Sequence, residues 1–268
     1  MAITTTVERV GPDLVRVRHL IVNLYLWGTP DRWVLIDGGM PGASGPIVEA
    51  AEEHLGTGNA PDAVILTHGH FDHIGAFPGL FERWDVPVYA HPLELPFLTG
   101  QNSYPSPDPF IGDGVMPLLS VTFPRGPIDL GERVRALPQD GSIPGMEGWR
   151  WLHTPGHSAG HVSLFRDEDR TLIAGDAFVT TKQESMYSIM TQDQEVHGPP
   201  AYFTPDWPAA KRSVEMLAHL RPSLAATGHG APMRGDDMTR QLATLAANFE
   251  AMAVPDHGKY VPEEMKGK

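Results

Sequence analysis

The sequence predicts an α/β fold in which two packed β-sheets carry helices on their outer faces. The chain has 268 residues, of which 41% are hydrophobic, so it is long enough to bury a sizeable core. Segments typical of strands and of helices alternate in two successive blocks, which fits two packed sheets better than one doubly wound sheet. Polar residues directly follow several of the expected strands, where α/β folds build their sites.

The first block of elements begins with a run of antiparallel strands. Residues 14–39 alternate apolar and polar side chains and turn at Gly-Thr-Pro-Asp. Residues 44–56 begin with Ser, show helical spacing and end with Gly, which predicts a helix. A short buried strand is expected within residues 62–70, and a second helix from Asp72 to Leu80. The block ends with an expected strand at 86–91 and a helical turn at 92–98.

The second block repeats this order of strands followed by helices. The expected strands are 133–137, 149–154, 161–167, 170–176 and 223–230, and the expected helices are 207–220 and 236–253. Two long irregular stretches, residues 100–125 and 183–207, interrupt the pattern, and loops of this length in a compact domain are usually functional. Since the sequence has no low-complexity tract and no linker, we expect one domain over residues 1–268.

Composition excludes several classes of protein and site. The chain contains no cysteine, so any metal site must use nitrogen and oxygen ligands. The formal net charge of −13, without a dense basic patch, argues against a nucleic-acid partner. No apolar run approaches the length of a membrane helix, and the first residues do not resemble a secretory signal. We therefore expect a cytoplasmic protein with no membrane partner, with a homodimer as an open option.

A dense polar segment follows the apolar run Ala-Val-Ile-Leu. It places His68, His70, Asp72 and His73 within six positions, and burying such groups without compensation is costly. Neutral imidazole and carboxylate are ligands of zinc and related divalent metals. His68 and His70 flank a glycine, so a bent segment can direct both at one ion. Asp72 and His73 are neighbours at an expected helix start and do not share a face, so they need not bind the same ion.

Three further strand ends carry a metal-ligand type of side chain beside a glycine: His157, Asp176 and His229. With the first segment they make seven candidate ligands, more than the three or four protein ligands of one zinc ion. Seven ligands therefore fit two metal ions that share one carboxylate. We interpret the remaining histidines as surface or structural residues: His19, His54, His91, His153, His161, His197, His219 and His257.

These seven residues resemble the ligand pattern of the metallo-β-lactamase superfamily of hydrolases. That pattern is a His-x-His-x-Asp-His segment followed by a His, a bridging Asp and a final His, and the resemblance covers roughly residues 12–235. Asp37 matches an acid that the superfamily carries after an early strand pair, where it supports the site without binding metal. The resemblance implies a four-layer αββα sandwich, with two mixed β-sheets flanked by helices and the metals at one edge.

The resemblance also implies how the ligands divide between two ions. One ion would be held by His68, His70 and His157, the other by Asp72, His73 and His229, and Asp176 would bridge them. We expect two divalent ions, zinc above all, with iron or manganese as alternatives. Two cations lower the pKa of a bridging water, and the hydroxide attacks a carbonyl that one metal polarises. Asp72 then orients the hydroxide and carries its proton to the leaving group.

Departures from the resemblance narrow the substrate class. One class of β-lactamases needs a Cys ligand, which is absent here, and another generally lacks the bridging acid that this chain has as Asp176. The segment after His229 is too short for the glutathione-binding domain of glyoxalase II-like thioesterases. Lactonases of acyl-homoserine lactones commonly place a Tyr shortly after the bridging Asp, where this chain has Phe178. We therefore expect a hydrolase of a small carboxylic ester, lactone, thioester or amide.

An oxidoreductase is the alternative to this hydrolase. Persulfide dioxygenases share the fold and the motif, but they use a single iron held by two His and one Asp. The metal content of the protein and its oxygen uptake with a persulfide distinguish the two functions.

The two long loops are where we expect the small-molecule substrate to bind. Phe178, Tyr187 and Tyr202 are candidate substrate contacts. The loops carry these aromatic and methionine side chains: Tyr104, Phe110, Met116, Met186, Tyr187, Met190, Tyr202, Phe203 and Trp207. Packing of the loops or a dimer surface explains these residues equally well. The roles of both loops and of the C-terminal segment around His257 and Tyr260 stay open.

Overall fold

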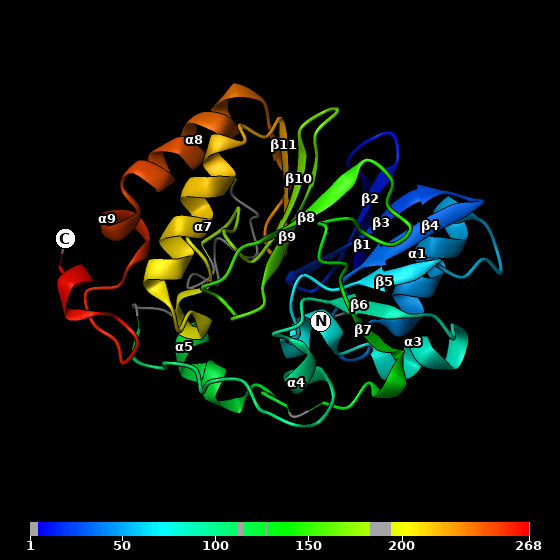
Figure 1. The fold of residues 1–268 in the computed structure, drawn as a ribbon, viewed down its shortest axis with the longest axis horizontal. Coiled ribbons are helices and arrows are strands. Elements are labelled where there is room, and N and C mark those ends of the chain that lie inside the picture. The colour runs from blue at the N-terminus through cyan, green and yellow to red at the C-terminus, as the bar shows by residue number, and fades with distance from the viewer. Residues whose placement is uncertain (1–4, 112–114, 127, 183–193, 268) are drawn as a thin grey trace. The chain divides into compact units, whose positions relative to one another are not determined.

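The computed structural model describes residues 5–111, 115–126, 128–182 and 194–267. They form two compact units, one within Met1–Tyr104 and Gly126–Arg150, the other within Pro105–Arg125 and Trp151–Lys268. Each unit contains helices and most or all of one mixed β-sheet (Figure 1). The predicted α/β class with two mixed sheets and flanking helices is thereby confirmed. The single domain over residues 1–268 stays a prediction.

The sheet of the first unit has its seven strands in sequence order. They are β1 (Thr5–Arg9), β2 (Leu14–His19), β3 (Val22–Thr29), β4 (Arg32–Ile36), β5 (Ala63–Ile65), β6 (Val88–Ala90) and β7 (Val134–Ala136). Strands β2 to β4 pair antiparallel, as the alternation after Leu14 predicts, and β1, which was not predicted, pairs antiparallel with β2. Strands β4 to β7 pair parallel. Because β4 and β5 are parallel neighbours, Asp37 and His68 follow them at the same edge of the sheet.

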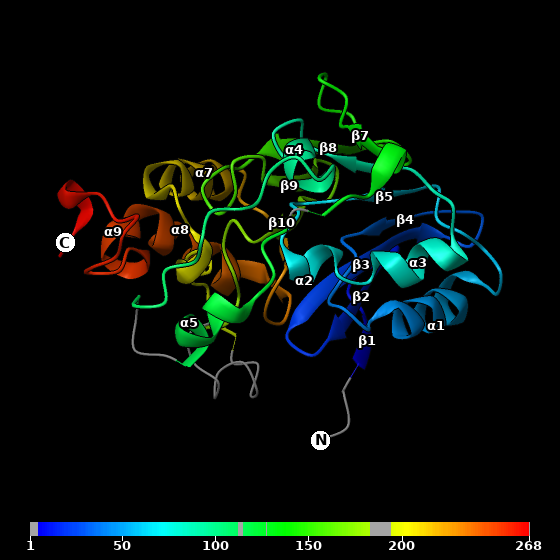
Figure 2. The ribbon, with the colours of Figure 1, turned by 90° about the horizontal axis from the view of Figure 1, so that it is seen from below.

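Four helices accompany this sheet: α1 (Ser44–Leu55), α2 (Phe71–Ile74), α3 (Phe77–Arg83) and α4 (Leu95–Leu98). Figure 2 shows α1 and α3 along one face of the sheet. Their residues Ile47 and Phe77 are fully buried in one apolar core with Leu24 of β3 and Leu35 of β4. Truncating Phe77 to alanine in such a core costs about 3–5 kcal/mol.

The helix predicted from Asp72 to Leu80 is wrong as one element, because the chain forms the separate helices α2 and α3. The interruption lies at Gly75 and Ala76. The Gly75 N–H donates to the Gly39 carbonyl at 2.7 Å. A Cβ at Gly75 would lie 2.2 Å from the Pro41 ring, so this turn packs too closely for a side chain. A tertiary contact thus replaces the continuous helix.

The second sheet has the strand order β12-β11-β10-β9-β8. Its strands are β8 (Trp149–His153), β9 (Val162–Arg166), β10 (Thr171–Gly175), β11 (Leu224–Thr227) and β12 (Met233–Arg234). Strands β10 and β11 pair parallel, whereas β9–β10 and β11–β12 pair antiparallel. Asp176 and the segment leading to His229 therefore follow neighbouring parallel strands at one edge.

The helices that the structure describes in the second unit are α5 (Val115–Leu119), α7 (Trp207–His219), α8 (Gly235–Ala247) and α9 (Phe249–Ala253). Asp206 caps α7 by accepting a hydrogen bond from the Ala209 N–H at 2.9 Å. Helices α7 and α8 lie side by side (Figure 1). The predicted helix over residues 236–253 is interrupted at Asn248, whose φ of −123° is not helical.

Short 3₁₀ turns complete the described elements: η1 (Ser120–Thr122), η2 (Gly131–Arg133), η3 (Ala201–Phe203) and η4 (Glu263–Met265). Within the described ranges, no helix combines the length and the apolar character that crossing a membrane requires.

Candidate metal centre

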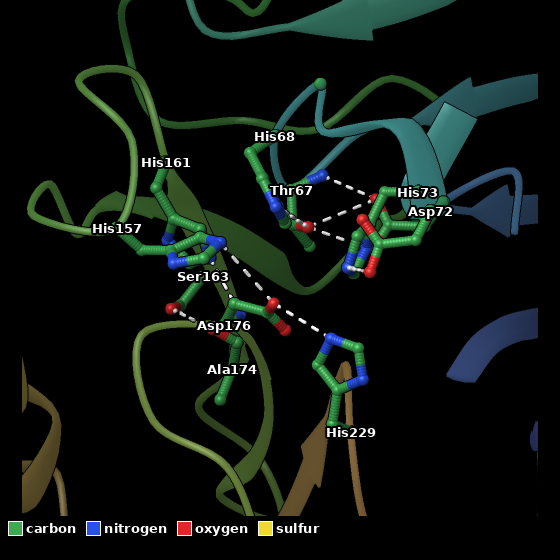
Figure 3. A network of polar contacts seen from close by, with 12 residues as sticks. Thr67, His68, Asp72, His73, His157, His161, Ser163, Ala174, Asp176 and His229 are labelled. Carbon is green, nitrogen blue, oxygen red and sulfur yellow. Dashed lines mark hydrogen bonds and ion pairs between the residues drawn. The ribbon is translucent and has the colours of Figure 1, made fainter. Parts of the chain in front are cut away.

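The first unit brings its three predicted histidine ligands together where β5 ends and α2 begins. His68 and His73 are fully buried and His70 is nearly so. The ring centroid of His68 lies 4.7 Å from that of His70 and 4.2 Å from that of His73. Asp72, on the first turn of α2, has a carboxylate oxygen 3.9 Å from Nε2 of His73. The sequence segment therefore folds into a compact set of nitrogen and oxygen donors, of which Figure 3 shows His68, Asp72 and His73.

Asp37 connects this set to the end of β4. Its backbone has a φ of +63°, in the left-handed region that aspartate tolerates better than most residues. The buried carboxylate accepts hydrogen bonds from the Thr67 backbone N–H at 2.8 Å and from the Thr67 hydroxyl at 2.9 Å. It also contacts Nδ1 of His73 at 2.9 Å. Asp37 thus lies beneath the candidate ligands and contacts one of them directly.

These contacts fix which ring nitrogens can bind a metal. A carboxylate accepts hydrogen bonds, so Nδ1 of His73 carries the hydrogen and donates it to Asp37. The single hydroxyl hydrogen of Thr67 also goes to Asp37, so Nδ1 of His68, at 3.1 Å, donates to the Thr67 hydroxyl. In neutral imidazoles both Nε2 atoms then keep their lone pairs. The donor set therefore fits a divalent cation, because metal-binding histidines usually donate their other N–H to such a partner.

The second unit places the other three predicted ligands around one carboxylate. Asp176 directly follows β10, and His157 and His229 follow β8 and β11. All three side chains are buried. One oxygen of Asp176, Oδ2, lies 3.5 Å from Nε2 of His157 and 3.1 Å from Nε2 of His229 (Figure 3). This position of the Asp176 carboxylate, between the imidazoles of His157 and His229, is suitable for a ligand that bridges two metal ions.

The His157 loop is held by hydrogen bonds from Asp206, the N-cap of α7, and from Ser213 of α7. The Asp206 N–H donates to the Gly156 carbonyl at 3.3 Å, and the Ser213 hydroxyl donates to the Pro155 carbonyl at 2.7 Å. Gly156 has a φ of +138°, and a Cβ there would lie 2.5 Å from the backbone of Ala210. Only glycine permits this approach of the loop to the helix, so the helix fixes the backbone beside His157.

His161, which the sequence suggests is structural, is buried and supports Asp176. Its Nε2 accepts a hydrogen bond from the Asp176 backbone N–H at 2.9 Å. Nδ1 must therefore carry the hydrogen, which it donates to the Thr154 hydroxyl at 2.8 Å. Thr154 in turn contacts the Ser163 hydroxyl at 3.0 Å, and Ser163 donates to the Ala174 carbonyl at 2.9 Å (Figure 3). This hydrogen-bond chain fixes the tautomer of His161 and the backbone at Asp176.

Two of the three candidate substrate contacts are buried. Phe178 is fully buried and Tyr202 is 4% exposed, which favours packing roles for both in this conformation. Tyr187 lies outside the described residues. Their contact with substrate stays a prediction.

The C-terminal segment binds the first part of the loop at 100–125. His257 contacts the Phe110 carbonyl through Nε2 at 2.8 Å, and the Tyr260 hydroxyl donates to the Ser106 carbonyl at 2.8 Å. Both residues are thus engaged with loop backbone.

Three residues that contact the His68–His73 segment were not assigned to it from the sequence: Thr67, Glu94 and Tyr104. Thr67 follows β5 directly, so its place beside His68 was a usable signal. Tyr104 gave no such signal; it is buried against His70, with the ring centroids 4.6 Å apart. Burial and the neighbouring Glu94 carboxylate raise the pKa of Tyr104 well above that of a free phenol. Tyr104 therefore acts as a neutral hydroxyl donor.

The comparisons with known proteins agree with this donor chemistry. The model of the metallo-β-lactamase superfamily matches residues 17–229 of the chain. A relative from Bacillus subtilis strain 168, described as the probable metallo-hydrolase YflN, is 50% identical over 235 residues. The match spans 87% of this chain and 89% of the relative, so the similarity is not confined to the histidine motif.

Solved structures show the same fold. The di-iron-bound form of TTHA1623 is 27% identical and has a TM-score of 0.57, over 92% of this chain and 97% of that one. A B3 metallo-β-lactamase with an active-site glutamic acid is 18% identical and has a TM-score of 0.60, over 91% of this chain and 88% of the other. At this identity the second likeness concerns the fold alone.

Proposed function

Because the chain belongs to the metallo-β-lactamase superfamily and is a metal-dependent hydrolase, we propose that it binds two divalent ions and hydrolyses a small carboxylic ester, lactone, thioester or amide. One ion is assigned to His68, His70 and His157, the other to Asp72, His73 and His229, with Asp176 shared. Zinc is the first choice of metal, and iron or manganese are the alternatives. The predicted cytoplasmic location, the lack of a nucleic-acid partner and the homodimer option stay predictions.

The observation that carries this proposal is that Asp37 and Thr67 fix the tautomers of two candidate ligands, His68 and His73. Asp37 and Thr67 accept the Nδ1 hydrogens of His73 and His68, which reserves both Nε2 atoms for a cation. In the second unit, Asp176 lies within 3.5 Å of both His157 and His229, as expected of a shared carboxylate. The lack of cysteine agrees with a set of nitrogen and oxygen donors.

The roles of the chain's own residues follow from these donor sets. When bound, two divalent cations supply hydroxide near neutral pH and polarise the substrate carbonyl. Asp72, half-buried on the first turn of α2, orients the attacking water and carries its proton to the leaving group through a carboxylate oxygen. Asp37 and Thr67 keep the imidazoles of His73 and His68 in the required orientation, so little reorganisation accompanies the reaction.

A metal and substrate panel tests the proposed function. The protein is reconstituted separately with zinc, iron and manganese, its metal content is measured, and each form is assayed on esters, lactones, thioesters, amides and β-lactams. We expect about two ions per chain and hydrolysis of one of the first four classes. The proposal fails if the metal-loaded protein hydrolyses no ester, lactone, thioester or amide. One iron per chain, with oxygen consumption on a persulfide, would instead establish the oxidoreductase alternative.

Asp72→Asn is expected to lower kcat by at least about 100-fold, because the amide cannot carry the proton. KM should change by less than about threefold, since general acid–base catalysis acts on the transition state. The rates are measured at saturating metal and normalised to bound metal, because Asp72 is also an assigned ligand. Asp85→Asn is the matched control, as its side chain is 87% exposed on the surface. A change confined to KM would contradict the role given to Asp72.

A further inference from the structure

A second buried carboxylate contacts the segment that carries His68 and His70. Glu94, the residue before α4, is fully buried, and its Oε2 accepts a hydrogen bond from the Gly69 backbone N–H at 3.0 Å. The Tyr104 hydroxyl donates to the same oxygen. One carboxylate oxygen thus joins the peptide between two candidate ligands to a buried phenol. All of these residues belong to the first unit.

The backbone at Gly69 packs tightly against this pair. A Cβ added to Gly69 would lie 2.5 Å from the Tyr104 hydroxyl oxygen and 2.7 Å from Leu98 Cδ2. No real Cβ tolerates such contacts, so the absence of a side chain lets the His-Gly-His segment rest directly on Tyr104 and α4. Glycine by itself leaves the backbone conformation poorly defined. The hydrogen bond to Glu94 and this close packing restrict it.

Tyr104 is itself fixed by ring contacts on two sides. Its ring stacks on Phe97, with centroids 4.2 Å apart and an interplanar angle of 17°. It also meets the His70 imidazole at an angle of 66°. Tyr104 therefore restricts the His70 ring through van der Waals contact and the Glu94 carboxylate through a hydrogen bond.

From this geometry we propose that Glu94 and Tyr104 are positioning residues for the metal ligands His68 and His70. Glu94 fixes the peptide that joins the two ligands, and Tyr104 fixes both Glu94 and the His70 ring. The inference rests on the proposed function, since it assigns these histidines to a metal. Neither residue reacts with the substrate; both hold the two donors in the geometry that a cation requires before it binds.

Zinc affinity measured by competition with a chromogenic chelator tests this role. Glu94→Ala removes the acceptor of the Gly69 N–H and should weaken zinc binding about 10–100-fold. Glu94→Gln keeps an oxygen that can accept from Gly69, so it should recover part of that loss. Tyr104→Phe keeps the ring and removes the hydroxyl, so a loss of about 2–5-fold is expected, smaller than that of Glu94→Ala.

Two matched controls separate positioning from general destabilisation. Asp108→Asn alters another buried carboxylate that accepts backbone N–H bonds, from Phe110 and Lys259. Tyr260→Phe removes a hydroxyl that donates to the Ser106 carbonyl. Thermal unfolding of the metal-free proteins is measured in parallel. Both controls should bind zinc within about twofold of the unaltered protein, even where the unfolding temperature falls.

Each outcome decides the inference. Zinc affinity of Glu94→Ala within twofold of the unaltered protein overturns it, and so does an equal loss in Asp108→Asn. If Glu94→Ala does not fold, the zinc affinity of Tyr104→Phe decides the question. An unchanged zinc affinity in Tyr104→Phe would then overturn the inference. If the unaltered protein binds no zinc, iron or manganese, the proposed function fails first and the inference fails with it. If the unaltered protein binds metal and the Glu94 variants bind it equally well, only the positioning role is overturned and the proposed function stands.

Discussion

His157→Ala is expected to lose tightly bound metal and to lower kcat/KM at least about 1,000-fold, equivalent to about 4 kcal/mol of transition-state stabilisation. The substitution removes a buried imidazole whose Nε2 lies 3.5 Å from Asp176. The loop itself should persist, because hydrogen bonds from the Asp206 N–H and the Ser213 hydroxyl hold its backbone against α7. Metal content, hydrolysis by the active substrate class and metal-free thermal unfolding are measured on the same preparation.

His219→Ala is the control for this experiment. His219 is an exposed histidine at the end of α7, and its ring contacts the Glu215 carbonyl. The metal content and activity of His219→Ala should match those of the unaltered protein. If His157→Ala retains full metal content and rate, His157 is not a ligand and the assigned division of the ions is wrong.

Asp37→Ala should strongly destabilise the protein. The change leaves the Thr67 N–H, the Thr67 hydroxyl and the His73 Nδ1–H buried without the acceptor that they share. A buried donor that loses its partner costs about 1–3 kcal/mol, so we expect a total loss of about 3–5 kcal/mol. Zinc affinity should also fall about 10–100-fold, because His68 and His73 lose their orientation. Denaturant unfolding of the metal-free protein and a zinc titration measure the two effects separately.

Asp31→Ala provides the comparison for Asp37→Ala. Asp31 is an exposed aspartate between β3 and β4, and its loss should change the free energy of unfolding by less than about 0.5 kcal/mol. A loss below 1 kcal/mol in Asp37→Ala would mean that water or a neighbouring group replaces the carboxylate. Asp37 would then not determine the tautomers of His68 and His73.

Much of the fold is predictable because local patterns and tertiary packing agree. The alternation after Leu14 yields β2, β3 and β4, and the helical spacing after Ser44 yields α1. The errors arise where tertiary contacts override the local pattern. Gly75 bonds to Gly39 and ends α2 early, which no periodicity within residues 72–80 reveals. The short strand β12 is also invisible to periodicity, because two residues show no alternation.

The candidate ligands were accessible from sequence for a different reason. Each is a metal-ligand type of side chain that lies in the segment after a strand and close to glycine, so residue type and position point to the same chemistry. The supporting residues lack this advantage. Glu94 lies 25 residues from Gly69 in the chain, and only the tertiary structure shows that it accepts the Gly69 N–H. His161 stood beside a candidate ligand, but its bond to the Asp176 backbone required the register of β9 and β10.

The hydrogen bonds that converge on Asp37 have an energetic consequence for the two imidazoles above it. His73 donates to Asp37 directly, whereas His68 donates to Thr67, whose hydroxyl hydrogen goes to the same carboxylate. The two rings therefore do not select their tautomers independently, since both choices depend on one acceptor. Free energies of changes at Thr67 and Asp37 will not add, because either change removes the same hydrogen bond from the Thr67 hydroxyl to Asp37. The tautomers of His68 and His73 are thus coupled through Asp37, although the proposed division gives the two rings to different ions.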